Sequence, residues 1–509
     1  MGQSVGIKVD PKKEIPIHRQ IFDEIVARIG NGTFPPGFKL PPTRTLAREL
    51  GAHRNTVARA YEDLESAGFV SAGVGRGTFV EAASKPSASK VATPKTSNAM
   101  PWSALVARAA RPEVLGRAER YARVEKKDVI NLARMQPSAD LLPDDLVRRC
   151  VTRVLAEQGT KAMTYAPPEG IPRLRESIAG ELAARGVPCV ADDVLVTTGS
   201  QQGLDLVARA LVNPGDALLV EATTYSGAID LFTLAGARLV GIASDKDGPD
   251  RAALDGSIGP DVKALYVMPN GHNPTGRTMT EERRRALVAW SRAARIPIIE
   301  DDFAAGLSLD EGNDPPYLRA LDGDVIHLST FSKRLIPALR LGYVVAPAPV
   351  RATLRSMKRV VDLGTSAILQ HALAEFIERG YLRAHMTRIT AEYRTRRDAL
   401  VHALEKGMPD GVKWVVPSHG IVLWLELPRT LDPDAVYAEA HARGVLVSPS
   451  PMWSVDPHAP PGIRLAFCAE PEGRLVEGVK RLGKAMKTLL ARAPRRGAHG
   501  PNETVLEAV

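Results

Sequence analysis

Twenty consecutive residues that cannot build a hydrophobic core divide this chain of 509 residues. Residues 81–100, EAASKPSASKVATPKTSNAM, contain no aromatic side chain and consist mainly of Ala, Ser, Lys, Pro and Thr. Such a composition buries too little apolar surface to offset the entropy that is lost when the chain is ordered. We therefore expect a linker here, with separately folded parts before and after it. The total length agrees, because a single hydrophobic core rarely extends beyond about 300 residues.

The positive charge of the chain is confined to the part before residue 128. The net charge is +9, and residues 1–127 hold 21 basic and 12 acidic residues, whereas residues 128–509 hold 46 of each. A short basic part attached to a large neutral part favours a nucleic-acid-binding module at the N-terminus. A solvated basic face without a partner would have the same charge, so charge alone leaves both interpretations open.

Residues 1–80 have the apolar pattern of a winged helix-turn-helix domain. Isoleucines recur every four residues between positions 17 and 29, which predicts a first helix. A second helix is expected in TRTLAREL, with Thr43 as its N-cap, and a third in RNTVARAYEDLESAG, residues 54–68. The glycine-containing turn at 51–53 joins these two helices. Two short strands around a glycine-rich tip at 73–77 would form the wing.

The start of the third helix is where a helix-turn-helix reads bases in the major groove. Arg54 can read guanine and Asn55 adenine through paired hydrogen bonds, while Thr56 can bind phosphate. The other candidate DNA-binding residues are Arg44 in the preceding helix and Gly75 and Arg76 in the wing. The alternative interpretation is a three-helix unit that binds protein.

The first 80 residues are also similar to a known family. The stretch IPIHRQIFDEIVARI, followed by LPPTRTLARELGAHRNTVARAYEDLESAGFV and GRGTFV, resembles the winged-helix domain of the GntR family of bacterial transcriptional regulators. The resemblance covers nearly all of residues 14–80 and implies that the chain binds double-stranded operator DNA.

After the linker, seven short apolar runs alternate with helical patterns, which is typical of an α/β domain with a largely parallel sheet. The runs are VLVT (194), ALLV (217), LVGI (239), ALYVM (264), IPII (296), VIHLS (325) and LGYVV (341). A ligand is expected at the carboxyl ends of such strands. We expect residues 128–490 to form this body, with a smaller lobe from about residue 400. Residues 81–127 would be a flexible basic linker, and residues 491–509 a disordered tail.

One motif of the body combines an amine with phosphate-binding groups. Lys333 follows a predicted strand in HLSTFSKRLIPALRLGY, where its amine can form a Schiff base with an aldehyde. The hydroxyls of Thr330 and Ser332 and the guanidinium of Arg340 flank this lysine and can bind a phosphate. This combination fits pyridoxal 5'-phosphate.

Two further motifs fit the same cofactor. In VTTGSQQGLDL, the backbone amides of Gly199, Ser200 and Gln201 lie at a predicted helix start, which favours phosphate binding. In IPIIEDD, a strand ends in two aspartates, and such a carboxylate can hold the pyridine nitrogen protonated. We choose Asp301 for this role, with Asp302 as the second choice. Each of these motifs alone is also an ordinary structural feature, whereas their order and spacing together indicate a cofactor site.

Residues from about 128 to 490 resemble the fold type I enzymes of the aspartate aminotransferase class. The matching motifs are YAPPEGIPRLRESIA, VTTGSQQGLDL, EATTYSG, MPNGHNPTG, IIEDDF, STFSKRLIPALRLGY and GIRLAF. The resemblance implies a mostly parallel seven-stranded sheet and a pyridoxal phosphate held by Lys333 and Asp301. It further implies that Tyr225 stacks on the cofactor ring, that Asn273 bonds the phenolic oxygen, and that Arg464 binds a substrate carboxylate.

Two positions bear on assembly and on catalysis. The resemblance implies that Tyr165 reaches the cofactor phosphate of a neighbouring subunit, so a homodimer is expected. Where these enzymes usually carry a tyrosine after the aspartates, as in EDDY, this chain has Phe303. The missing phenolic hydroxyl weakens the expectation of catalysis but not that of cofactor binding.

A GntR-type winged helix, a linker and an aminotransferase-like body in one chain resemble the MocR subfamily of transcriptional regulators. The first hypothesis is therefore a DNA-binding regulator that senses pyridoxal phosphate, an amino acid or another amine through Schiff-base chemistry at Lys333. The alternative is an active aminotransferase that converts an amino acid to a 2-oxo acid and carries an accessory DNA-binding domain.

The remaining sequence features concern the cellular compartment. No run reaches the roughly 18 consecutive apolar residues that a membrane-spanning helix needs, and the first 16 residues lack the apolar core of a secretion signal. Three cysteines offer no framework of paired disulfides. We therefore expect a cytoplasmic bacterial protein that does not contact membranes.

Overall fold

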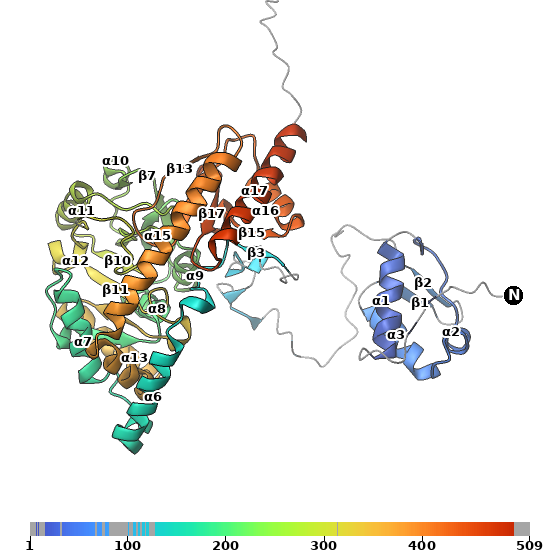
Figure 1. Cartoon of the computed structure of the whole chain (residues 1–509), viewed down its shortest axis with the longest axis horizontal. Coiled ribbons are helices and arrows are strands. Elements are labelled where there is room, and N and C mark those ends of the chain that lie inside the picture. The colour runs from blue at the N-terminus through green and yellow to red at the C-terminus, as the bar shows by residue number, and fades with distance from the viewer. Residues whose placement is uncertain are drawn as a thin grey trace, which may run out of the picture. The chain divides into compact units, whose positions relative to one another are not determined.

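The computed structural model describes residues 7, 9, 16–30, 33–66, 69–73, 77–80, 100, 105–107, 110–111, 115–117, 119–121, 128–312 and 314–492. The chain divides into two compact units, residues 1–100 and 101–509, and each unit has a hydrophobic core of its own (Figure 1). No helix within the described ranges is long and apolar enough to cross a lipid bilayer.

The N-terminal unit is a winged helix-turn-helix, as predicted. Its helices α1 (Ile17–Gly30), α2 (Thr43–Leu50) and α3 (Arg54–Ser66) share a core that includes Ile21, Ile25, Val57 and Leu64. Strands β1 (Val70–Gly73) and β2 (Gly77–Val80) pair antiparallel, with Gly73 opposite Gly77. Residues 74–76 lie outside the described residues, and so do the predicted DNA-binding residues Gly75 and Arg76.

The predicted N-cap of α2 was wrong by one position. Pro42, with φ −55° and ψ 141°, is the N-cap, and Thr43 is the first helical residue. The Pro42 carbonyl accepts the first helical hydrogen bonds, from the amides of Thr45 and Leu46. A proline fits this position because its φ is fixed near the helical value and it has no amide hydrogen to satisfy.

All seven predicted strands of the body are present, in one sheet with the order β4-β12-β11-β10-β9-β5-β6. The strands are β4 (Val194–Thr197), β5 (Ala217–Glu221), β6 (Arg238–Ile242), β9 (Val262–Val267), β10 (Ile298–Asp302), β11 (Ile326–Thr330) and β12 (Gly342–Val345). Only β12 is antiparallel to its neighbours, so the sheet is mixed but mostly parallel.

Helices cover both faces of this sheet (Figure 1), which explains why its strands are rich in apolar residues. Alternate strand residues such as Leu195, Ile299 and Leu328 join a core with α8 (Ser200–Leu211), α9 (Ser226–Leu234) and α13 (Ala348–Val361). The opposite face packs against the remaining helices of the large lobe. These are α6 (Asp144–Gln158), α7 (Pro172–Ala183), α11 (Glu281–Ala294), α12 (Leu318–Leu321) and α14 (Ala367–Glu378).

A smaller lobe follows, built on the sheet β13-β14-β17-β16 and three helices. The strands are β13 (Lys413–Trp414), β14 (Val422–Glu426), β16 (Ser448–Pro449) and β17 (Gly462–Ala466), and the helices are α15 (Tyr381–Gly407), α16 (Pro433–Ala442) and α17 (Glu472–Arg492). The core of this lobe also includes residues that precede the large sheet, because β3 (Ile130–Asn131) pairs with β15 (Val445–Leu446). The lobe is therefore assembled from both ends of the body, and not only from the residues after 400. The remaining short elements of the body are β7 (Ser244–Asp245), β8 (Gly248–Pro249) and α10 (Arg251–Asp255).

Two residues of the predicted linker contact the small lobe. The Tyr121 hydroxyl donates to Asp434 Oδ1 at 2.7 Å, and the Tyr121 carbonyl accepts from the Tyr437 hydroxyl. Arg117 donates to the Ser454 carbonyl at 2.8 Å. The expectation of a flexible linker up to residue 127 was thus wrong for these two residues. A basic composition does not prevent individual side chains from forming hydrogen bonds with the small lobe. Residues 81–99 and 493–509 lie outside the described residues, and α17 extends to Arg492, two residues into the predicted tail.

Candidate functional site

A cavity of about 240 Å³ lies where the parallel strands of the large sheet end, as the fold class predicts. It lies beside the ends of β10 and β11, the start of α8 and the loop after β9. Its lining residues are Met135, Ser200, Gln201, Tyr225, Met268, Asn273, Asp301, Phe303, Thr330, Ser332, Lys333, Arg340 and Arg464. The structure therefore brings most of the sequence-predicted site residues together around one space.

Lys333 lies in the turn that follows β11, with its amine inside the cavity wall. The amine donates a hydrogen bond of 2.7 Å to the Met135 carbonyl. Burial, together with the nearby guanidinium groups of Arg464 and Arg340, lowers the pKa of Lys333. A lowered pKa increases the fraction of neutral amine, which is the form that attacks a carbonyl carbon.

Asp301 is the last but one residue of β10, lines the same cavity as Lys333 and is buried. Its Oδ2 accepts a hydrogen bond of 2.8 Å from the Tyr266 hydroxyl, whereas its Oδ1 has no hydrogen-bond partner among the described residues. Burial raises the pKa of Asp301 to about 6. A buried carboxylate oxygen without a partner is costly, and a protonated ring nitrogen would satisfy it. This oxygen is the observation by which the cavity fits a pyridinium ring.

Asp302, the second choice for this role, does not line the cavity. Its Oδ1 accepts a hydrogen bond of 3.0 Å from Asn270, so this carboxylate is already satisfied elsewhere.

Phosphate-binding groups gather at the start of α8. Thr330 donates to Ser332 Oγ at 3.0 Å, and an Arg340 nitrogen lies 3.5 Å from the same oxygen. Gly199 is the N-cap of α8, with φ +80°, and a Cβ atom there would lie 2.8 Å from the Arg340 guanidinium. The absence of a side chain at Gly199 therefore lets the guanidinium approach the helix N-terminus, where backbone amides and the helix dipole favour an anion.

Tyr225, Asn273 and Arg464 complete the wall of the cavity. The Tyr225 hydroxyl donates to Gln201 at 3.1 Å, and burial raises its pKa to about 12. Arg464 donates to Asn273 Oδ1 at 3.2 Å, and its guanidinium lies 4.3 Å from the centre of the Trp453 ring. Burial lowers the pKa of Arg464 to about 10.

Some functional positions were missed by sequence reasoning or lie elsewhere. Tyr165 is 85% exposed and does not line the cavity of its own chain. Phe303 lines the cavity and brings no hydroxyl to it. Met135, Tyr266 and Trp453 contact the predicted residues but belong to no motif, so only the folded chain reveals them.

The start of α3 presents the predicted DNA-binding residues. Arg54, the first residue of α3, and Asn55 are exposed, and Thr56 is half-buried. Arg44 in α2 is exposed as well, and among the described residues neither arginine forms an ion pair. His53 also contributes here, because its Nδ1 accepts the Asn55 amide at 3.3 Å.

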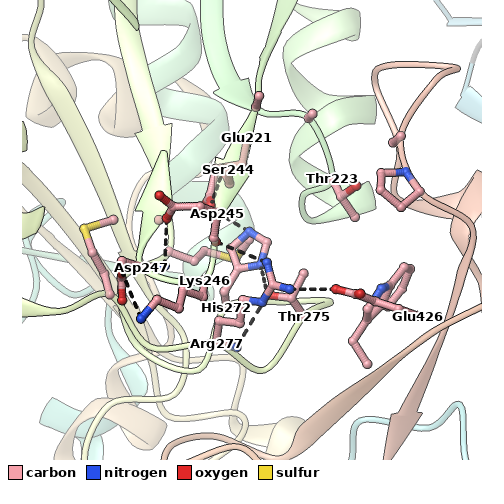
Figure 2. Close-up of a pocket in the computed structure, with 18 of the residues that line it drawn as sticks. Glu221, Thr223, Ser244, Asp245, Lys246, Asp247, His272, Thr275, Arg277 and Glu426 are labelled. Carbon is pink, nitrogen blue, oxygen red and sulfur yellow. Dashed lines mark hydrogen bonds and ion pairs between the residues drawn. The ribbon is translucent and has the colours of Figure 1, made fainter. Parts of the chain in front are cut away.

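A second cavity of about 440 Å³ lies between the two lobes of the body (Figure 2). Its lining combines apolar side chains such as Met279 and Trp424 with polar ones, several of which are paired with each other. The His272 imidazole lies 3.0 Å from the Glu221 carboxylate, and Arg277 donates to Glu426 on β14 at 2.7 Å. The Arg277–Glu426 pair therefore joins the large lobe to the small lobe.

These features define the class of protein. A winged helix-turn-helix is joined to an α/β body whose cavity combines a largely buried lysine, a buried carboxylate oxygen without a partner in the described part of the chain, and a helix start suited to an anion. This is a DNA-binding domain fused to a pyridoxal-phosphate-dependent transferase fold.

Comparison with known families gives the particular family. Residues 127–482 match the family Aminotransferase class I and II, and residues 17–80 match the gntR family of bacterial regulatory proteins. The chain belongs to the aminotransferase class I and II family and, with its GntR domain, to the MocR subfamily of regulators. The family implies pyridoxal phosphate as its cofactor.

Two curated relatives share both domains. The uncharacterized HTH-type transcriptional regulator YisV of Bacillus subtilis is 31% identical over 489 residues, which cover 94% of this chain and 98% of YisV. The probable rhizopine catabolism regulatory protein MocR of Rhizobium meliloti is 30% identical, over 94% of this chain and 96% of its own.

A solved structure matches the body. The α-aminoadipate aminotransferase LysN of Thermus thermophilus, complexed with N-(5'-phosphopyridoxyl)-L-leucine, has a TM-score of 0.71 and 30% identity. The match covers 77% of this chain and all of LysN.

Proposed function

We propose that this protein is a transcriptional regulator whose body binds pyridoxal phosphate and an amino compound, and thereby controls DNA binding by the winged helix. The observation that carries the proposal is the Asp301 Oδ1 atom, which is buried in the same cavity as the Lys333 amine and has no hydrogen-bond partner among the residues that the structure describes. A buried carboxylate with a purely structural role normally has hydrogen-bond donors for both of its oxygens.

Each residue of the cavity has a role in this proposal. Lys333 would hold the cofactor through a Schiff base with its aldehyde, which supplies an electrophilic imine that exchanges with amines. Asp301 would keep the ring nitrogen protonated, Tyr225 would stack on the ring and Asn273 would bond its phenolic oxygen. The phosphate would be held by Ser200, Gln201, Thr330, Ser332, Arg340 and the backbone at Gly199.

Arg464 supports an effector that carries a carboxylate. Its guanidinium lines the same cavity as Lys333, so one molecule with an amino group and a carboxylate can address both. An effector changes DNA affinity only by binding two conformations of the body with different affinities. We infer an amino acid as the effector class, with pyridoxal phosphate itself as the other compound to be tested.

The DNA-binding part of the proposal rests on α3. Arg54 and Asn55 are exposed at its first turn, and their side chains match guanine and adenine edges in the major groove. Arg44 would contact a phosphate. The relatives YisV and MocR, which have the same two domains, are named as regulators.

A homodimer is part of the proposal because of Tyr165. This tyrosine is 85% exposed although it belongs to a motif of the cofactor-binding family. A second subunit would give its hydroxyl a role at the neighbouring phosphate. Light scattering at micromolar concentration should give about twice the chain mass of 54.8 kDa, and a mass of one chain would contradict the dimer.

Aminotransferase activity is the second candidate function. The presence of Arg464 and Asn273 beside Lys333 favours it, whereas Phe303, which brings no hydroxyl to the cavity, does not. Adding an amino acid and then a 2-oxo acid, while the visible absorption is recorded, discriminates between aminotransferase activity and sensing. Full recovery of the original visible absorption supports turnover, and a spectral change that an oxo acid does not reverse supports sensing.

Lys333→Ala tests the cofactor claim directly. Wild-type protein reconstituted with pyridoxal phosphate should absorb visible light after dialysis, because the covalent link retains the cofactor, and Lys333→Ala should not. Lys358→Ala is the matched control, since Lys358 is also buried but pairs with Asp362 at 2.8 Å outside the cavity. Colourless wild-type protein would refute the assignment.

A further inference from the structure

A three-residue segment at 133–135 lies between the two side chains to which an amino-acid ligand would bind. The Met135 carbonyl accepts the hydrogen bond from Lys333 at 2.7 Å, and the Met135 sulfur lies 2.8 Å from a terminal nitrogen of Arg464. The Ala133 carbonyl accepts from the other terminal nitrogen of Arg464. One short stretch of chain therefore contacts both ends of the cavity.

Both terminal nitrogens of Arg464 have partners, and among the described residues only its buried Nε has no hydrogen-bond acceptor. One terminal nitrogen donates to Asn273 and contacts Met135, and the other donates to Ala133 and to Ser448 Oγ at 3.1 Å. A carboxylate binds arginine best through two parallel N–H donors. Such a ligand must therefore replace some of these contacts, and those of residues 133–135 lie on the side of Lys333.

Met135 is the weakest of these partners. A thioether sulfur is a poor hydrogen-bond acceptor, whereas a carboxylate forms a charge-assisted bond with a guanidinium. Burial lowers the pKa of Arg464 to about 10, and among the described residues no carboxylate forms an ion pair with it. A ligand carboxylate would supply an anion, so the exchange of Met135 for a carboxylate is favourable at Arg464. The opposing cost is the displacement of the half-buried Met135 side chain.

Hydrogen bonds hold the chain on both sides of Met135. Asn131 anchors the start of this segment, because the Asn131 side chain accepts the amides of Ala133 and Arg134 at 3.1 and 3.0 Å. Ser138 anchors its end through an amide hydrogen bond of 3.1 Å to the Cys468 carbonyl. A displacement is therefore confined to the residues around Met135.

We propose that Met135 determines which carboxylate ligands reach Arg464, and that a bound carboxylate displaces the Met135 side chain from Arg464. This inference rests on the proposed function, because it assigns Arg464 to the effector carboxylate. The ligand class is a small amino acid whose amino group faces Lys333.

Maleate tests this without chemistry at Lys333, because it has two carboxylates and no amino group. Full-length, cofactor-loaded protein is titrated with maleate by calorimetry. Met135→Ala should bind maleate about tenfold more tightly than the wild type, and Met135→Leu, which keeps the bulk, should stay within about threefold of it. Met386→Ala removes another half-buried methionine that does not line the cavity, and should have wild-type affinity.

A second readout is operator binding in the presence of an amino acid. The amino-acid concentration that gives half of the maximal change in operator affinity should be about tenfold lower in Met135→Ala than in the wild type. If Met135→Ala leaves maleate affinity unchanged while Arg464→Ala abolishes binding, the role of Met135 is refuted and the role of Arg464 is kept. Wild-type protein without visible absorption or operator binding would instead count against the proposed function.

Discussion

At the scale of single residues, the direction of a side chain decides which of two adjacent aspartates faces the cavity. Asp301 and Asp302 both end β10, and sequence reasoning could only prefer one of them. Successive strand residues point to opposite faces of a sheet, so only one of the two can face the cavity. Asp301 does, and Asp302 bonds Asn270 instead.

The raised pKa of Asp301 gives a prediction for pH and stability. Its folded-state pKa of about 6 exceeds the unfolded value of about 3.9, so the folded state binds more protons between these values. In cofactor-free protein, this carboxyl therefore lowers the free energy of unfolding as pH rises from 4 to 6. Above pH 6 the free energy of unfolding is lower by about 3 kcal/mol than it would be with an unshifted pKa.

Asp301→Asn isolates this effect, because the amide oxygen can still accept from Tyr266 but does not ionise. Urea denaturation of both cofactor-free proteins from pH 4 to pH 8 measures it. The variant should be relatively more stable at pH 7 than at pH 4, while its affinity for pyridoxal phosphate is lower. If the difference in free energy of unfolding between the two proteins does not change with pH, the raised pKa of Asp301 is refuted.

Gly199 is the residue at which backbone conformation serves the phosphate site. Gly199→Ala should destabilise the body by about 1–3 kcal/mol, because φ +80° with ψ 166° is accessible almost only to glycine. The added Cβ would also displace Arg340, so affinity for pyridoxal phosphate should fall about tenfold. Gly180→Ala is the control, because Gly180 lies exposed in α7 with no atom near its Cβ position. Denaturation and cofactor titration of both variants check this.

At the scale of elements, burial explains which parts were predictable. Most strands of the large sheet are buried along their whole length, so they appear in the sequence as short apolar runs, whereas the edge strand β6 is partly exposed. By contrast, β3 and β15 are two-residue strands whose pairing joins positions more than 300 residues apart. No local pattern encodes such a pairing, and this is why Met135, which follows β3, was not foreseen as part of the site.

Helix α3 gives a prediction about sequence recognition. Arg54→Ala should weaken operator binding by about 1–3 kcal/mol and reduce discrimination against random DNA, because base contacts carry specificity. Arg44→Ala should weaken operator and random DNA alike and lower the salt slope by about 1. Gel-shift titrations at several salt concentrations distinguish the two effects. Equal losses on both DNAs in Arg54→Ala would remove it from base readout.

At the scale of the whole molecule, the linker composition has a measurable consequence. The +9 charge of residues 1–127 is concentrated after the winged helix, since residues 81–127 hold 10 basic and 4 acidic residues. Deleting residues 85–100 removes Lys85, Lys90 and Lys95. If these lysines neutralise phosphates, the slope of log affinity against log salt should lose about 3. An unchanged slope would show that the segment serves only as a spacer.

The exposure of Tyr165 has a genetic consequence. In the proposed dimer, each cofactor cavity takes Lys333 from one subunit and Tyr165 from the other. A Tyr165→Phe chain and a Lys333→Ala chain, each defective when produced alone, would then form mixed dimers in which one cavity carries both defects and the other carries neither. Co-expression of two inactive alleles should therefore restore part of the regulation.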